Sequence, residues 1–196
     1  RGGEVLVDGR VVRIRNPRQA IRAGLALVPE DRKLQGLILP MNVRQNVSLA
    51  WLPRASPLGW LSRRAESQHA ERQIRDLSIR AHSAEQRVLE LSGGNQQKVA
   101  LAKWLTLKPR VLILDEPTRG VDVGAKQEIY RLMRSAAERG MGLLMISSEM
   151  EEVVGVSDRV LVMREGRIAG ELKGEQIAEQ DVLRLAVGAQ NSETAA

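Results

Sequence analysis

The feature that most constrains this chain is an unbroken apolar run, Val111 to Leu114, that leads directly into Asp115 and Glu116. An apolar run without alternation is typical of a strand buried on both faces, as in a parallel sheet. Parallel sheets bind ligands at the carboxyl ends of their strands, where this pair lies. Two carboxylates there lose hydration and need a cation, a proton or a hydrogen-bond donor. A helix N-cap is the alternative interpretation, because Asp, Pro and Thr after a strand also begin helices.

A second stretch, LSGGNQQK at 91–98, opens a predicted helix that continues to Leu107. Ser92 is suited to the N-cap position, and the two glycines after it allow backbone N–H groups to approach a ligand closely. Such a helix start can hold a phosphate through its unpaired N–H groups and its dipole. Taken alone, the stretch is equally typical of an ordinary capped helix.

Composition excludes several classes of protein. The chain has 196 residues, enough for one domain with a real core, and is 43% hydrophobic and 28% charged, as globular proteins are. It contains no cysteine, which excludes disulfides and thiolate metal sites and is consistent with a cytosolic protein. The net charge of +6 is scattered, and aromatic residues make up only 2%, so no stacking platform for a nucleic acid is expected.

Periodicity and turn residues predict an α/β protein with a mostly parallel sheet and antiparallel hairpins. Met41 to Glu90 is mostly helical in pattern, and both histidines, His69 and His82, are expected at the surface. The other predicted elements are a hairpin over 5–14, a helix over 18–23, a strand over 25–28, a helix over 125–139, a buried strand over 142–146, a hairpin over 158–171, a helix over 174–187 and a disordered tail over 189–196.

Four stretches together resemble the motifs of ATP-binding cassette (ABC) ATPases, and the match covers about residues 3 to 175. They are VPEDRK at 28–33, LSGGNQQKVALAKWL at 91–105, EPTRGVDVGAK at 116–126 and SSEMEEV at 147–153. More narrowly, they resemble the C-terminal cassette of the tandem ATPases that drive bacterial importers of ribose, galactose and xylose. The resemblance implies a P-loop NTPase-like fold, with a partial nucleotide-binding domain over 1–188 and a helical subdomain over about 41–107.

The resemblance also implies roles for particular residues in hydrolysing ATP. Asp115 would hold Mg²⁺, usually through water, and Glu116 would polarise the attacking water. Asp122 would cross the interface between two cassettes as the D-loop residue. The residues expected to contact the γ-phosphate of ATP held by the opposite cassette are Ser92, Gly93, Gly94 and Gln96.

The sequence departs from the family pattern in three places. Glu30 stands where the family has the Q-loop glutamine that reaches the magnesium, and a carboxylate there would alter the charge of the site. Ser148 replaces the switch histidine; its hydroxyl can hydrogen-bond a γ-phosphate but cannot accept a full proton at neutral pH. No GxxxxGK[ST] motif occurs, so we expect a fragment that lacks the Walker A strand and helix and is inactive by itself.

The implied cofactors are ATP and Mg²⁺. The implied partners are a second ABC cassette (an N-terminal half or a homodimer), transmembrane permease subunits and, indirectly, a periplasmic sugar-binding protein, with no nucleic acid. The implied location is the cytoplasmic side of the bacterial inner membrane, as a peripheral protein. Two alternatives stay open, an ABC ATPase that acts on nucleic acid and a non-catalytic regulatory cassette. Family topology further implies that strand 143–146 has an unpaired apolar edge, a liability for self-association.

Overall fold

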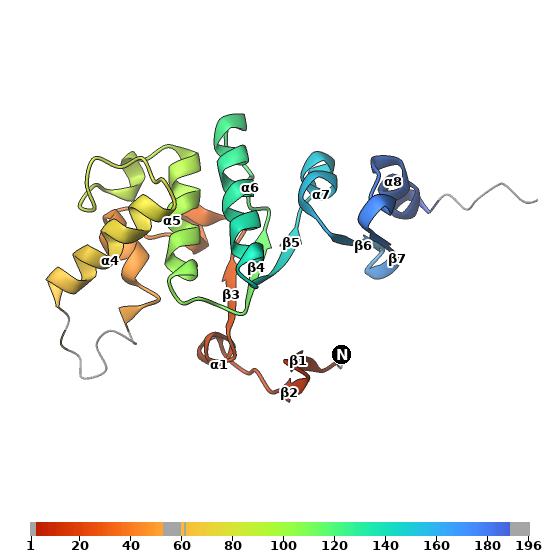
Figure 1. Cartoon of the computed structure of the whole chain (residues 1–196), viewed down its shortest axis with the longest axis horizontal. Coiled ribbons are helices and arrows are strands. Elements are labelled where there is room, and N and C mark those ends of the chain that lie inside the picture. The colour runs from red at the N-terminus through yellow and green to blue at the C-terminus, as the bar shows by residue number, and fades with distance from the viewer. Residues whose placement is uncertain (1–2, 53–59, 61, 189–196) are drawn as a thin grey trace, which may run out of the picture. The chain divides into compact units, whose positions relative to one another are not determined.

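The computed structural model describes residues 3–52, 60 and 62–188, and the chain divides into two compact units, residues 1–146 and 147–196. Each unit is described by itself, and Figure 1 labels its elements. The elements of the first unit are β1 (Val5–Val7), β2 (Arg10–Val12), α1 (Pro17–Arg22), β3 (Leu25–Val28), η1 (Arg32–Gly36), α2 (Val43–Ser48), α4 (Arg63–Asp76), η2 (Val88–Glu90), α5 (Gly93–Leu105), β4 (Val111–Asp115), α6 (Val123–Glu138) and β5 (Gly142–Ile146). Those of the second unit are α7 (Met150–Val156), β6 (Arg159–Arg164), β7 (Arg167–Lys173), η3 (Gly174–Gln176) and α8 (Glu179–Val187).

The centre of the first unit is a parallel sheet in the order β3-β4-β5. The predicted parallel arrangement is therefore confirmed. Val28 and Met145 both pair with Leu114, and Asp115 pairs with Ile146. Asp115 is thus the last residue of the middle strand, at the carboxyl edge of the sheet.

The two faces of this sheet differ in burial. Val28, Leu112 and Leu114 are almost fully buried, on the face packed by α5 and α6, which contact β3 and β5 respectively (Figure 1). On the opposite face Leu144 and Ile146 are each 51% exposed. The prediction that 142–146 is a buried strand is therefore wrong, because β5 alternates between half-buried and exposed residues.

Within residues 41–107 of the first unit, α2 packs against α4 and α5. Asn42 is the N-cap of α2 and forms a capping box with Gln45. The surface position predicted for His69 is wrong. His69 is 8% exposed, its ring stacks on Trp51 with centroids 4.5 Å apart, and it shares a hydrogen bond with the Thr106 hydroxyl.

The predicted hairpins are also present. Asp8 and Gly9 join β1 to β2 with φ angles of 51° and 73°, as a tight Asp-Gly turn requires. In the second unit β6 pairs antiparallel with β7, and the hairpin packs on α8 around Val160, Val162 and Leu172. The predicted tail over 189–196 lies outside the described residues. Within the described part of the chain, no helix has the length and apolarity needed to cross a membrane.

Candidate nucleotide site

The carboxylate pair lies where β4 ends and the chain turns. The backbone N–H of Glu116 donates to the carbonyl oxygen of Ile146 over 2.9 Å, which extends the pairing of β4 with β5 by one residue. Glu116 itself has φ +47°, a left-handed conformation that a side chain disfavours by ~1–3 kcal/mol. The N-cap interpretation of Asp115 is wrong, because the next helix, α6, is capped by Asp122. Strain of this kind clusters at functional sites, so Glu116 becomes the first candidate for chemistry.

The start of α5 is held by a chain of side-chain contacts. Ser92 is the N-cap, and its hydroxyl oxygen accepts from the backbone N–H and the side-chain amide of Asn95, at 3.4 and 2.9 Å. Asn95 in turn accepts from the backbone N–H of Arg80 over 2.8 Å. Asn95 is not among the predicted site residues; its only signal in the sequence is an amide side chain three residues after a serine cap. A hollow of about 320 Å³ opens beside this helix start and is lined by Arg80, Ser92 and Asn95, among others.

The two glycines at this helix start are required by packing as well as by any ligand. A Cβ on Gly93 would lie 2.8 Å from Nη2 of Arg32 and 3.0 Å from the carbonyl oxygen of Gly120. A Cβ on Gly94 would collide with the Cβ of Ala125. Residues 93–94 therefore dock directly on the segment that follows Glu116. From the sequence, the two glycines are expected to let a ligand approach this backbone closely. In the structure, residues of the protein itself lie that close.

Two of the predicted ligand residues have structural partners. Gln96 is buried, and its amide nitrogen donates to the carbonyl oxygens of Val88 and Leu91, at 3.1 and 3.2 Å. This contact fixes the turn that leads into α5. Asp122 accepts from the backbone N–H of Ala125 over 2.9 Å, so it caps α6 beside Gly94.

Glu30 and Ser148, which depart from the family pattern, lie in different surroundings. Glu30 is exposed and forms an ion pair with Arg119, so its charge is already compensated by a guanidinium. Ser148 belongs to the second unit, where its side chain is exposed. Its neighbour Ser147 donates to the buried carboxylate of Glu152 and accepts from the backbone N–H of Glu149, which orders the start of α7.

The donor set at the end of β4 suits Mg²⁺ better than a transition metal. Across the described residues, no group of three or more His, Cys, Asp or Glu side chains is arranged to hold a metal ion. Mg²⁺ commonly keeps several waters and takes one or two carboxylates together with substrate phosphates. Asp115, with Glu116 next to it, supplies that number of carboxylates.

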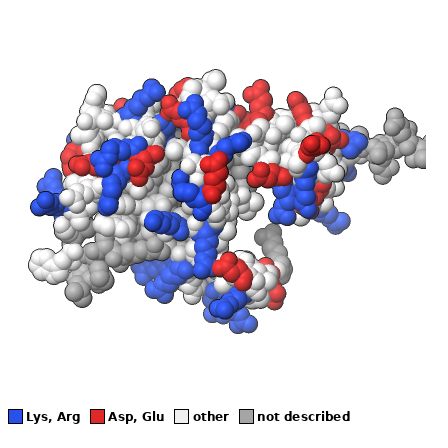
Figure 2. Space-filling model, viewed as in Figure 1, with Lys and Arg blue, Asp and Glu red and all other residues white. Residues whose placement is uncertain are grey.

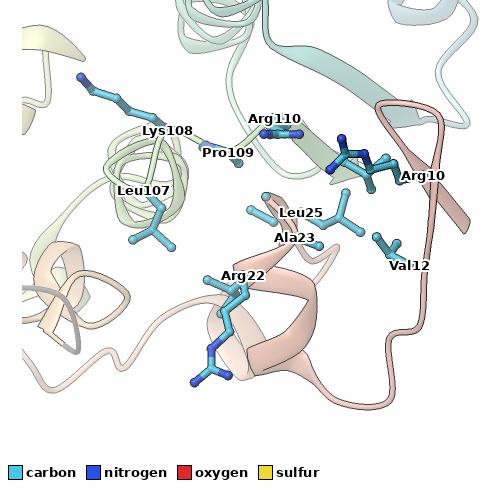
Figure 3. Close-up of a pocket in the computed structure, with 13 residues that line it drawn as sticks. Arg10, Val12, Arg22, Ala23, Leu25, Leu107, Lys108, Pro109 and Arg110 are labelled. Carbon is cyan, nitrogen blue, oxygen red and sulfur yellow. The ribbon is translucent and has the colours of Figure 1, made fainter.

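A second cavity lies away from these residues. It has a volume of about 450 Å³ and surrounds the opposite, amino-terminal edge of the sheet, between Leu25 and Arg110. Figure 3 shows apolar Val12, Leu25 and Leu107 around it, with the end of the Arg22 side chain directed away. In addition, Arg110 is paired with Asp8. Arg10 and Lys108 also line the cavity, but it lies apart from the carboxylates and the start of α5, and we assign it no ligand.

Comparison with known proteins identifies the family. Residues 1–119, more than half of the chain, match the family model described as ABC transporter. The chain is 48% identical over 195 residues to the ribose import ATP-binding protein RbsA 2 of Escherichia coli O157:H7. It is 50% identical over 186 residues to the xylose import ATP-binding protein XylG of Moorella thermoacetica. The chain therefore belongs to the ABC transporter family.

These matches cover 100% and 95% of this chain, but only 38% and 37% of the length of the two relatives. Solved structures agree on the fold. A nucleotide-free ATP-binding cassette from an ABC transporter aligns with TM-score 0.77 at 22% identity, over 93% of this chain and 73% of that one. The cassette cbiO1 from Clostridium perfringens aligns with TM-score 0.73 at 26% identity, over 93% and 71%. The predicted P-loop NTPase-like cassette fold is confirmed.

Proposed function

We propose that this chain supplies part of an ATP-hydrolysis site in the ATP-binding subunit of a bacterial importer for a simple sugar. The observation that carries the proposal is Glu116, a carboxylate held in a left-handed conformation at the carboxyl end of the middle parallel strand. The docking of residues 93–94 on the segment after Glu116 supports it, because a phosphate-binding helix start and a carboxylate then share one rigid region. The printed names of the relatives support the sugar-import part.

In this proposal Glu116 accepts a proton from the attacking water and so makes it a better nucleophile. Asp115 holds Mg²⁺, directly or through water, and the bound ion neutralises phosphate charge. Catalysis of this kind depends on position and electrostatics more than on covalent chemistry. The strained backbone at Glu116, fixed by its bond to Ile146, is a means of setting that position.

The start of α5 faces the γ-phosphate of ATP that is bound to a second cassette. Ser92, Gly93 and Gly94 present the positive end of the helix and its unpaired N–H groups to the phosphate. Asp122 lies beside Gly94 and reaches across the same interface. We assign Gln96 to positioning, since its amide is bonded to the preceding turn. The phosphate-cradling loop comes from residues outside this sequence, which has no GxxxxGK[ST] motif.

The remaining partners follow from the same proposal. The second cassette is an N-terminal half of the same protein or another copy. Permease subunits bind the helical part of the first unit, a periplasmic sugar-binding protein delivers the sugar to them, and this chain lies on the cytoplasmic side of the inner membrane as a peripheral protein. Glu30 and Ser148 take the places of the Q-loop glutamine and the switch histidine and lower the efficiency of this site.

The test is ATP hydrolysis by a protein of the relatives' full length that contains this chain, compared with its Glu116→Gln variant. We expect turnover to fall ~10²- to 10⁴-fold, as on loss of a general base, while ATP binding is retained. Glu138→Gln, an exposed glutamate at the end of α6, is the matched control and should leave turnover unchanged. Unchanged turnover in Glu116→Gln, with ATP still bound, would overturn the catalytic role and favour the regulatory cassette.

The distribution of charged side chains gives less support to the alternative that this chain acts on nucleic acid. On the face shown in Figure 2, lysine and arginine side chains are interspersed with aspartate and glutamate over the described residues. A protein that binds a phosphate backbone gathers its cations along one surface and loses affinity steeply with salt. Strong, salt-dependent binding of the full-length protein to DNA or RNA would support this alternative over sugar import.

A further inference from the structure

Arg32 carries the furthest inference that the described residues allow. It begins η1, two residues after Glu30, and only 9% of it is exposed. Its Nη1 donates to the carbonyl oxygen of Arg119 over 2.7 Å, and its Nη2 donates to that of Gly120 over 3.1 Å. Burial lowers the pKa of this guanidinium, with Asp31 opposing the shift. A buried cation is thus held by two neutral acceptors on consecutive residues.

The guanidinium of arginine fits this arrangement closely. Two carbonyl oxygens on consecutive residues match its fixed fork of two nitrogens, whereas a lysine ammonium has all its donors on one nitrogen. The fork also packs against Gly93, where a Cβ would lie 2.8 Å from Nη2. Arg32, Gly93 and Gly120 therefore form one close-packed junction.

The junction joins the parts of the site that lie far apart in sequence. Gly93 follows the Ser92 cap of α5, and residues 119–120 lie between Glu116 and Asp122. Residues 30–32 are joined to residues 119–120 a second time, because Arg119 pairs with Glu30. Two arginines, one from each segment, thus cross between residues 30–32 and residues 119–120.

We propose that Arg32 is a positioning residue for ATP hydrolysis, which fixes the segment from Glu116 to Asp122 against the start of α5. The catalytic carboxylate and the phosphate-binding helix start then move as one body. Arg32 acts through these backbone contacts and does not itself touch the nucleotide. The inference rests on the proposed function.

The test uses a full-length protein that contains this chain and compares Arg32→Lys with the parent. We expect kcat for ATP hydrolysis to fall ~10- to 100-fold, as a displacement of about 1 Å produces, with KM for ATP changed less than about threefold. Amide hydrogen exchange over 117–122 should accelerate, while exchange in α4 stays as in the parent. Arg134→Lys, an exposed arginine on α6, is the matched control and should match the parent in all three measurements.

Each outcome decides the question. Unchanged kcat and unchanged exchange at 117–122 in a folded Arg32→Lys protein overturn the proposal. If Arg32→Lys does not fold, Arg32→Gln, which keeps one donor nitrogen in place of two, replaces it; failure of both to fold shows a structural role only and also overturns the proposal. Glu116→Gln is measured alongside. If Glu116→Gln keeps full turnover, the proposed function has failed. If exchange at 117–122 is then still slow in the parent and fast in Arg32→Lys, Arg32 orders this loop without a role in catalysis, and the proposal is overturned.

Discussion

The ammonium group of Lys98 on α5 forms an ion pair with the carboxylate of Glu128 on α6, and it also donates to the carbonyl oxygen of Ser78 over 2.8 Å. Lys98 is 1% exposed, so its charge is almost entirely removed from water. A cation in such a place is stable only when it is paired and hydrogen-bonded. Glu128 therefore compensates a buried charge at the contact between the two helices that frame the candidate site.

We expect Glu128→Gln to lower the free energy of unfolding by ~2 kcal/mol, because Lys98 stays buried without its counter-charge. The value is below the loss for a fully buried pair, since the Glu128 side chain is 28% exposed. Urea denaturation checks it, with Glu138→Gln as the control on the same helix. No difference between the two variants would show that Ser78 alone satisfies Lys98.

The same pair predicts a pH dependence. The hydrogen bond from Lys98 lowers the pKa of Glu128, with further help from the charges of Lys98, Arg80 and Arg131. Because the folded pKa lies below the unfolded one, the contribution is fully present above the unfolded pKa and is lost as pH falls through the folded pKa. The stability difference between the parent and Glu128→Gln should therefore shrink as the pH falls below 4.5, the ordinary pKa of a glutamate carboxyl group. A difference that stays constant into acid would contradict this.

The left-handed conformation of Glu116 predicts that its backbone is strained, at a cost in stability. Glycine adopts φ +47° without the steric cost that any other residue bears. We therefore expect Glu116→Gly to be more stable than Glu116→Ala by ~1 kcal/mol, although both lack the carboxylate. Comparing the two variants with each other, by urea denaturation, isolates the backbone strain. An alanine variant as stable as the glycine variant would show that Glu116 bears no strain.

Sequence patterns predicted the strands of the central sheet and their parallel direction, because unbroken apolar runs such as 111–114 are typical of parallel strands. They could not predict how much of β5 is exposed, since an apolar run reports hydrophobicity and not which neighbours cover it. The same limit explains the error at His69: its helix has a polar sequence, and contacts with Trp51 and Thr106, far away in sequence, hold the ring.

The candidate site was predicted in part. Asp115, Glu116 and Ser92 follow from a strand end and a helix cap, which are local signals. Arg32 and Asn95 were missed, because their partners are backbone groups 15 to 88 residues away, which no local pattern reveals. The positive φ of Glu116 was likewise invisible, since glutamate rarely adopts it.

The burial of His69 predicts a second pH effect. Desolvation, followed by the charge of Arg72, lowers the pKa of His69 below 6.5. The neutral ring is favoured in the fold, so its contribution is present above pH 6.5 and is lost as pH falls through the folded pKa. We expect unfolding stability to decline over that window in the parent and to decline less in His69→Gln. His82→Gln, which alters an exposed histidine, should keep the slope of the parent, and an equal slope in His69→Gln would contradict the prediction.

The exposed face of the sheet predicts self-association of this 196-residue chain. In the described residues β5 is an edge strand, paired with β4 alone, and Leu144 and Ile146 are each 51% exposed on it. An apolar edge strand with unpaired backbone groups is a template for pairing with another chain. Leu144→Lys should shift the chain toward monomer in sedimentation velocity without loss of stability, because a charged edge residue opposes pairing and Leu144 is already half exposed. Leu183→Lys, which changes an exposed leucine on α8, should leave association unchanged. A parent chain that stays monomeric at high concentration, with slow amide exchange over 143–146, would show that this edge is protected.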